Sequence, residues 1–474
     1  MANQIWARDT RIDLTKSPNH RMHALIGRHL TSFSMLLSGL MLTVVLPISN
    51  QAVAQTTPDF GPNVYIVDPS MSSATINATL ATLASYEQFD TRRAAVLFEP
   101  GTYTGIKSEV GFYESITGLG ETPSAVKLSQ SFLESNELIN GNDTQTFWRS
   151  MENLEMTTPG SGTLQWGVSQ GTSLRRMLIN NPVELTDSGC NFSSGGFIAD
   201  SQVTGNVNSC SQQQWFTRNS VIGSWTGSNW NMVFAGVEGA PFQNYPSNAF
   251  TVLPTTPVSR EKPFLYVNKR GGYRVFVPDA KEHSSGVSWS SQRLGEGSSL
   301  PIDDFFIAQP STALADINRA LAFGENLILT PGIYQYSGAI KVTRPDTIVL
   351  GMGYATLVPQ TGTPAIEVAD VDGVRIASLL IDAGPVNSPV LLQMGNPNGR
   401  RRSHAWNPTS LNDMFFRIAG ATPGTATTSL EIDSDDVILD NIWAWRADHG
   451  NGVGWTVNVA DHGLVVNGDN VTAL

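Results

Sequence analysis

The sequence predicts an all-β protein made of two tandem right-handed parallel β-helices. Two observations predict this fold: a set of features that recurs in the same order in both halves of the chain, and short strands spaced at the length of one β-helix coil. A β-sandwich would instead show evenly spaced strands joined by hairpins, and the Asn-Gly and Asp-Gly turns typical of hairpins are scarce here.

The recurring features mark two copies of one opening unit, near residue 60 and near residue 305. They are a Pro-Ser pair, an Ile-Asn pair, a strand that runs into Pro-Gly-x-Tyr, and an apolar stretch that ends in Gly-x-Gly. The first copy comprises Pro69-Ser70, Ile76-Asn77, Phe98–Tyr103 and Ile116–Gly120, and the second comprises Pro310-Ser311, Ile317-Asn318, Leu329–Tyr334 and Val349–Gly353. In each copy we expect a helix, over 73–85 and over 313–323, that covers the open end of the stack.

Short strands follow each opening unit and are separated by Gly, Asn and Ser. After the first unit, Leu154, Leu178, Val203 and Val221 occupy similar places at intervals of roughly 18 to 25 residues, about one coil. After the second unit, the strands expected over 374–376, 415–418, 437–439 and 464–466 continue the pattern.

These patterns divide the chain into four parts: a signal peptide (1–54), a first β-helix (55–253), a connecting region (254–300) and a second β-helix (301–474). The connecting region is rich in Pro, Ser and Gly, and Lys269–Gly272 predicts the turn of a small hairpin within it. Leu464–Asp469 is typical of a strand and turn in the middle of a stack, and only five residues follow it. We therefore expect the second β-helix to be truncated at its C-terminus.

The N-terminus is typical of an export signal. Arg8, Arg11, Lys16, Arg21 and Arg28 form a basic leader, an apolar run follows over 33–48, and Ala52-Val53-Ala54 supplies small residues for cleavage before Gln55. An uncleaved membrane anchor is the alternative, although the run is short for a span of about 20 residues. The sequence thus predicts a secreted protein with no stable membrane association after cleavage.

Charge and composition point to a neutral partner. The chain after residue 54 has 24 Lys and Arg against 39 Asp and Glu, a formal charge of −15, which disfavours nucleic acid and anionic membranes as partners. The low charge content and the 43 glycines fit a β-rich extracellular protein that binds a polysaccharide. Cys190 and Cys210 are either bridged or unpaired, and they lack a metal-type spacing, so we expect no metal and no cofactor.

The densest set of candidate functional residues lies between 440 and 451. Trp443 and Trp445 fall on one face of a strand because side chains alternate, and an outward pair of indoles makes a platform for a sugar ring. Asp448 and His449 follow at the strand's end, where they could bind hydroxyls or hold a catalytic group. Alternatively, the tryptophans fill the interior of the helix and Asp448 caps a turn.

A second candidate set joins Ser194–Asp200 to the segment Gln212–Asn219. Glutamines that point outward can bind hydroxyls or position a water molecule. Amides that point inward can instead form a stacked polar ladder inside the β-helix. The residues themselves leave both readings open.

Together these motifs resemble glycoside hydrolase family 55. The resemblance rests on the paired Pro-Gly-x-Tyr units, Ser-Gly-Gly-Phe-x-x-Asp, Gln-Gln-Trp-x-x-Arg-Asn, Phe-Phe-Arg-Ile-x-Gly and Trp-x-Trp-x-Ala-Asp-His, and it covers most of residues 60–470. It implies two tandem right-handed β-helices and a secreted β-1,3-glucanase of the laminarinase type. No nucleotide-phosphate motif or paired-metal motif supports a different chemistry.

The resemblance also implies an inverting mechanism, in which a carboxylic acid protonates the leaving oxygen while water attacks from the opposite face. It places Gln213 and Gln214 on the water side of a cleft between the helices and Asp448 and His449 on the sugar side. Further substrate contacts would come from Trp443, Trp445, Arg446 and Trp215.

The family's acid is a Glu soon after the Trp-x-Trp-x-Ala-Asp-His segment, and no Glu follows Glu431, so the acid is expected beyond Leu474. Without it, residues 55–474 are expected to be nearly inactive and prone to aggregate.

Two other functions remain open from the sequence. A polysaccharide lyase of the same architecture would use Ca²⁺ on clustered carboxylates, for which Asp433, Asp435, Asp436 and Asp440 are candidates. A non-catalytic glycan-binding surface protein is the second alternative.

Overall fold

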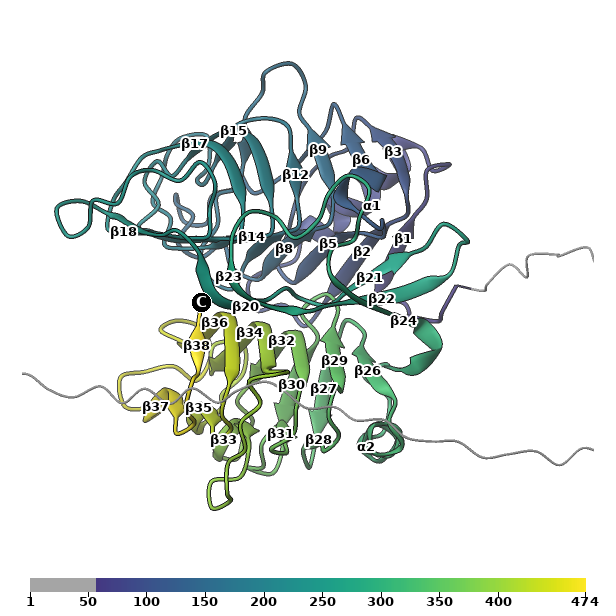
Figure 1. Cartoon of the computed structure of the whole chain (residues 1–474), viewed down its shortest axis with the longest axis vertical. Coiled ribbons are helices and arrows are strands. Elements are labelled where there is room, and N and C mark those ends of the chain that lie inside the picture. Colours follow the sequence, from purple (N-terminus) through teal and green to yellow (C-terminus); the bar gives the residue numbers. More distant parts are fainter. Residues whose placement is uncertain (1–56) are drawn as a thin grey trace, which may run out of the picture. The chain divides into compact units, whose positions relative to one another are not determined.

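The computed structural model describes residues 57–474, and these residues form two parallel β-helices joined by a short antiparallel region (Figure 1). Among the described strands, antiparallel pairing is confined to the connection between the two helices, and the other strand pairs are parallel. The predicted tandem β-helix is therefore confirmed, and the β-sandwich is excluded. The predicted signal peptide lies outside the described residues.

The first β-helix is built on two main sheets. Along one side the order is β1 (Val64–Val67), β2 (Ala94–Phe98), β5 (Glu114–Gly118), β8 (Arg149–Glu152), β11 (Ser173–Arg175), β14 (Phe197–Ala199), β16 (Gln214–Arg218), β18 (Asn231–Ala235) and β19 (Phe250–Leu253). The second sheet holds β3 (Gly101–Thr104), β6 (Val126–Ser129), β9 (Glu155–Thr157), β12 (Leu178–Ile179), β15 (Gln202–Asn208), β13 (Val183–Glu184) and β10 (Leu164–Gln165), with β17 (Val221–Thr226) paired to β15. A short pair, β4 (Lys107–Glu109) and β7 (Phe132–Glu134), lies apart from both.

The second β-helix repeats this plan. One sheet holds β25 (Phe305–Ala308), β26 (Asn326–Leu329), β29 (Ile348–Gly351), β32 (Arg375–Asp382), β34 (Thr409–Ile418), β36 (Val437–Arg446) and β38 (Thr472–Ala473), together with β27 (Ile333–Tyr336) and β30 (Thr356–Pro359). The other sheet holds β28 (Ile340–Val342), β31 (Ile366–Val368), β33 (Ser388–Met394), β35 (Ala426–Ile432) and β37 (His462–Val466).

Both predicted helices are present, as α1 (Ser73–Ala84) and α2 (Leu314–Phe323). The side chain of Ser72 caps α1 by accepting a hydrogen bond from the backbone of its third residue, and Gly324 ends α2 in the left-handed conformation that glycine favours. Each helix buries one apolar face against the start of its stack.

The repeated opening unit has the same atomic contacts in both copies. Gly101 packs so closely on Pro69 that a Cβ at this position would lie 2.3 Å from the proline ring, and Gly332 meets Pro310 at 2.2 Å in the same way. Only glycine fits such an approach. The glycine of each Pro-Gly pair is therefore needed for a contact between the strand after the helix and the proline of the Pro-Ser pair before it.

Two further residues of the unit make equivalent hydrogen bonds. The hydroxyl oxygens of Tyr103 and Tyr334 each lie 2.8 Å from two backbone carbonyl oxygens, which share the single O–H donor. The amides of Asn77 and Asn318 each bridge a backbone carbonyl and a backbone N–H of a following coil. The repeated sequence features therefore make the same contacts in both opening units.

The predicted alignment of the coils is wrong by one or two residues. Val203 pairs with Ile179 on one side and Ile222 on the other, and Ile179 pairs with Met156. The predicted equivalents were Leu154, Leu178 and Val221. Because side chains alternate, a slip of one residue would turn an apolar residue out of the core. The packing of the interior, and not the length of the coil, therefore fixes the register.

The connecting region forms the predicted hairpin and adds further strands. β21 (Phe264–Val267) and β22 (Tyr273–Pro278) pair in antiparallel fashion across the turn at 269–272, and β24 (Gly297–Pro301) joins β22. β20 (Thr256–Arg260) pairs with β23 (Ala280–Ser284).

Buried ion pairs tie the two β-helices together. Arg175 of the first helix binds Asp413 and Asp440 of the second, each at 2.8 Å. Arg218 binds Asp440 at 2.9 Å and Glu261 of the connecting region at 2.6 Å. The faces of the two helices are therefore held in one arrangement beside the candidate site.

Candidate active site

The candidate site is a cleft of about 520 Å³ between the first and second β-helices. A volume of this size is typical of small-molecule sites. The first helix contributes Gln170, Gly171, Gly195, Gly196, Gln214, Trp215, Phe216, Asn231, Val233, Ala235 and Leu253, and further lining residues are Pro257, Asn441, Ile442, Trp443, Thr472, Ala473 and Leu474.

Glycines form the floor of the cleft. A Cβ on Gly195 would lie 3.5 Å from the Cγ atoms of both Gln170 and Gln214, so this glycine occupies the hollow between the two amides. A Cβ on Gly171 would lie 3.1 Å from the indole of Trp443. The floor is therefore flat backbone, with glutamines from the first helix and an indole from the second around it.

Ser194 holds the two glutamines. Nε2 of Gln214 donates to the carbonyl of Ser194 at 3.3 Å, and Nε2 of Gln170 donates to the same carbonyl. The hydroxyl of Ser194 donates to Oε1 of Gln170 at 3.2 Å. Within the described residues, Oε1 of Gln214 has no such donor, which leaves it available as an acceptor in the cleft.

The three glutamines of the segment 212–214 have different surroundings. Gln212 is fully buried, donates to the carbonyls of Val168 and Leu185 at 2.8 and 2.9 Å, and accepts from the N–H of Gly195 at 2.7 Å. The inward reading thus applies to Gln212 and the outward reading to Gln214. Gln213 lies in the bend before β16 and does not line the cleft.

Residues in the left-handed conformation position the tryptophan strand. Asn441 in β36 and Asp413 in β34 both have positive φ, of 64° and 52°, which Asn and Asp tolerate better than most residues. The amide of Asn441 donates to Asp413 at 2.7 Å and to the carbonyl of Thr172 in the first helix at 3.1 Å. The strand segment that follows is thereby fixed against the first helix.

Trp443 and Trp445 lie on the outward face of β36. Their rings stack at 5.2 Å between centroids, and both contact Phe147 of the first helix, at 4.9 and 5.5 Å. Trp443 also packs on Trp148 at 4.9 Å. The alternative that the pair fills the interior of the second helix is therefore wrong. Trp443 lines the cleft, whereas Trp445 is taken up by aromatic packing.

The remaining residues predicted near the sugar lie beside the cleft rather than in it. Nδ1 of His449 lies 2.6 Å from Asp448, and its other ring nitrogen lies 2.6 Å from the amide nitrogen of Gln88 in the first helix. Arg446 donates to backbone carbonyls of residues 454, 455 and 458, and so fixes the following loop. None of these side chains is among the cleft residues, and their roles stay predictions.

Trp215 borders the cleft with one edge, but its ring belongs to the core of the first helix. It is 3% exposed, and a Cβ on Gly196 would lie 2.2 Å from its ring. Its predicted contact with substrate stays untested.

The four aspartates of the lyase alternative do not form a calcium site. Asp440 lies between Arg175 and Arg218. Burial alone would raise the pKa of Asp440, but the two guanidinium groups hold it below the ordinary value. The other three carboxylates, on Asp433, Asp435 and Asp436, each bind separate hydrogen-bond donors.

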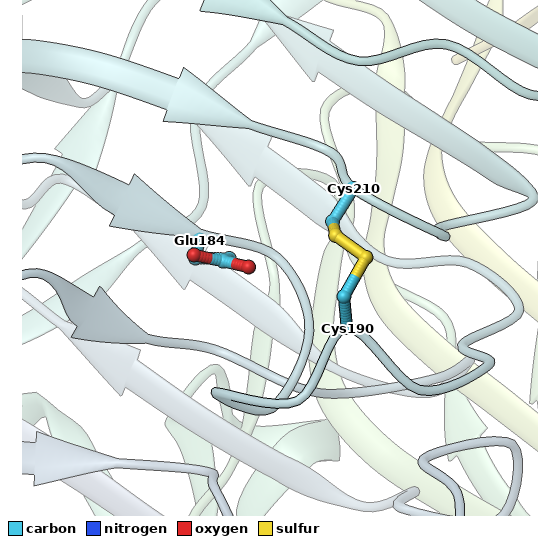
Figure 2. A group of neighbouring side chains, drawn as sticks. All are labelled: Glu184, Cys190 and Cys210. Atoms are coloured by element: carbon cyan, nitrogen blue, oxygen red, sulfur yellow. A yellow bond between two sulfur atoms is a disulfide. The ribbon is translucent and has the colours of Figure 1, made fainter.

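One group in the described chain has the spacing of a metal site, namely Glu184, Cys190 and Cys210 (Figure 2). The two sulfur atoms are joined in a disulfide, with the Cα atoms 5.8 Å apart. The group therefore lacks the thiolates that would bind a metal. The disulfide also answers the question of the cysteine pairing that the sequence left open.

The sequence reasoning missed two polar residues of the cleft, Gln170 and Asn231. Gln170 lies one coil before Ser194, because Leu174 of β11 pairs with Ile198 of β14. The correct coil register would have aligned Gln170 with the Ser-Gly-Gly segment. Within residues 57–474, no aspartate or glutamate is among the lining residues of the cleft.

Comparison with known families places both helices among pectate-lyase-like domains. Residues 305–474 match the LAM55 pectate lyase-like domain, and residues 70–240 match the family described as rhamnogalacturonase A/epimerase, pectate lyase-like. Over 417 residues the chain is 47% identical to an exo-β-1,3-glucanase of Streptomyces sp. (strain SirexAA-E / ActE), covering 88% of this chain and 68% of that protein.

Two solved structures are similar over the same region. SacteLam55A from Streptomyces sp. SirexAA-E has a TM-score of 0.84 at 46% identity, and the match covers 88% of this chain and 75% of that one. A variant of the same protein with a glutamate replaced by alanine, in complex with glucose, has a TM-score of 0.83 at 46% identity, with the same coverage.

Proposed function

This chain belongs to glycoside hydrolase family 55, and from that membership we propose that it hydrolyses laminarin-type β-1,3-glucan in the cleft between its two β-helices. The observation that carries the proposal is that Gln170, Gln214 and Trp443 lie around the same glycine floor. Amides can bind neutral hydroxyl groups, and an indole can cover the apolar face of a sugar ring.

The sugar side of the cleft is the face of Trp443. A glucosyl residue would stack on the part of this indole that lines the cleft, and Gly171 lets the indoles of Trp148 and Trp443 pack against the backbone. Asn231 and Asn441 line the same cleft and offer donors and acceptors to its hydroxyls. The relative's name includes exo action and a similar structure holds glucose, so we extend release of glucose to this chain as part of the proposal.

The water side is the free Oε1 of Gln214. In an inverting hydrolase a water molecule attacks the anomeric carbon from the face opposite the leaving oxygen. The amide of Gln214, whose Nε2 donates to the carbonyl of Ser194, can accept a hydrogen bond from that water at its Oε1 and orient it. Gln214 keeps its predicted role in this proposal, and Gln170 joins it. The general acid expected from the family resemblance stays a prediction.

Binding is the direct test of the substrate class, because it does not depend on turnover. Isothermal titration should show that the protein binds laminaritriose and does not bind trigalacturonate. Trp443→Ala should weaken laminaritriose binding by about tenfold, since it removes the stacking surface. Trp406→Ala is the matched control, because Trp406 is fully exposed and lies outside the cleft.

Binding of trigalacturonate instead would favour the lyase. Equal losses in the two tryptophan variants would contradict the cleft as the glucan site. If turnover is observed, glucose released first as the β-anomer would overturn the inverting mechanism.

Export is a further part of the proposal. It is supported by the basic leader, by the apolar run over 33–48 and by Ala52–Ala54, which all lie outside the described residues. The Cys190–Cys210 disulfide supports it as well, since disulfides persist mainly in oxidising compartments. Among the helices that the structure describes, none is long and apolar enough to cross a membrane.

A further inference from the structure

Trp230 differs from the other tryptophans of the first β-helix. Over the described part of this helix, Trp148, Trp166, Trp215 and Trp225 are buried, with at most 9% of their surface exposed. Trp230 is 71% exposed. An indole on the outside of a helix that otherwise buries its tryptophans points to a role at the surface.

Trp230 directly precedes a residue that lines the cleft, Asn231. Its backbone N–H donates to the carbonyl of Gln213 at 3.0 Å, so it lies one coil beyond Gln213, about 4.8 Å along the stack. The next residue, Asn231, pairs with Gln214, and both line the cleft. Trp230 is therefore the chain neighbour of a residue on the glutamine side of the cleft, although it is not itself a lining residue.

The turn that carries Trp230 is braced. The amide of Asn229 donates to the carbonyl of Gln212 at 3.2 Å and to that of Cys210 at 3.4 Å. The indole N–H of Trp225 donates to the carbonyl of Gly227 at 3.1 Å, where the backbone is left-handed with φ of 81°. A ligand that binds an anchored side chain loses less conformational entropy than one that must order a free loop.

We propose that Trp230 is a second sugar-binding platform, which takes a further glucosyl residue of the β-1,3-glucan chain that occupies the cleft. The proposal rests on the proposed function. A flat indole buries the apolar C–H face of a sugar and leaves its hydroxyls in water. A glucan chain that leaves the residue stacked on Trp443 and follows the coils past Gln214 meets Trp230 next on the first helix.

The test compares two lengths of the same ligand on the full chain. Isothermal titration with laminaritriose and laminarihexaose should show tighter binding of the hexaose by the parent protein. In Trp230→Ala the hexaose should lose about tenfold in affinity and the triose should keep its own, because only the longer ligand reaches the platform. Trp230→Phe should restore most of the loss, and Trp406→Ala, which removes an exposed indole elsewhere, should match the parent.

Three outcomes would overturn the platform: unchanged hexaose affinity in Trp230→Ala, an equal loss for both ligands, or an equal loss in Trp406→Ala. Since Trp230 is exposed, an unchanged melting temperature should accompany its replacement, which separates lost binding from lost folding. Failure of the proposed function looks different. In that case the parent binds neither oligosaccharide, or Trp443→Ala leaves the triose affinity unchanged.

Discussion

Asp440, in the second β-helix, binds the guanidinium groups of two arginines of the first β-helix. It is fully buried, and both of its oxygens accept hydrogen bonds from Arg175 and Arg218. Such a pair stabilises little compared with an apolar core, but removal of one partner leaves a buried charge without compensation. Asp440 therefore matters more for holding the two helices in register than its surface neighbours do.

We expect Asp440→Ala to lower the free energy of unfolding by about 3 to 5 kcal/mol, because both buried arginines would lose one of their two carboxylate partners at once. The matched control is Asp435→Ala, in the turn just before β36, whose ion pair with Arg401 is partly exposed and should be worth about 1 kcal/mol or less. Urea unfolding followed by tryptophan fluorescence measures both. Equal effects of the two replacements would contradict the role given to Asp440.

The positions of the site residues could be predicted only where residues close in sequence determine them. Strand alternation places Trp443 and Trp445 on one face, and the structure confirms that they share a face. Phe147 covers the pair through contacts between residues some 300 apart in sequence. No local sequence pattern predicts such contacts. Gln170 was missed for a related reason, since its place depends on the coil register.

At the scale of elements, the opening units were predictable because each is self-contained. The Pro-Gly contact, the helix and the strand that follows lie within one short segment, so the sequence pattern and the structure coincide. Register is different. The coil that contains β15 has a shift between Val203 and Asn206, and such irregularities cannot be counted from spacing alone.

The disulfide is an element-scale brace between two neighbouring coils. Cys190 lies just before the segment of Ser194, and Cys210 just before that of Gln214, with a separation of 20 residues. Cys190→Ser with Cys210→Ser should lower the free energy of unfolding by about 3 kcal/mol, the value for closing a loop of this length. The measurement is urea unfolding with and without dithiothreitol. The reductant should destabilise the parent and leave the double variant unchanged, and the idea fails if both respond alike.

At the scale of the whole molecule, the described residues 57–474 belong to one compact unit rather than to two independent lobes. The sequence predicted two stacks and a connection, because each stack has its own internal pattern. The ion pairs between the stacks were not predictable, since Arg175 and Asp413 each sit in an ordinary strand with no motif around them. Their pairing follows from the packing of the two helices.

Buried carboxyl groups should make the stability of this molecule depend on pH. Burial raises the pKa of Glu114 to about 8 and that of Asp143 to about 6. Burial, together with the charge of Glu261, raises the pKa of Asp200 to about 7. A carboxyl group with a higher pKa in the folded protein stabilises it fully below the unfolded pKa near 4, and this contribution is lost as pH rises through the folded value. These three groups therefore favour the folded state at acid pH.

Glu114 offers the sharpest test, because its side chain is fully buried and its Oε1 has no hydrogen-bond partner among the described residues. Glu114→Gln removes the ionisation but keeps the shape. Calorimetric melting from pH 5 to pH 9 should show the parent losing stability as pH rises and the variant losing less. The stabilities of the parent and the variant should be close at pH 5, and the variant should be the more stable at pH 9 by on the order of 2 to 4 kcal/mol.

The control is Glu325→Gln, on an exposed side chain, which should lose stability with rising pH as steeply as the parent does. A parent whose melting temperature does not fall between pH 5 and pH 9, or a Glu114→Gln variant that falls as steeply, would show that Glu114 stays ionised in its buried site.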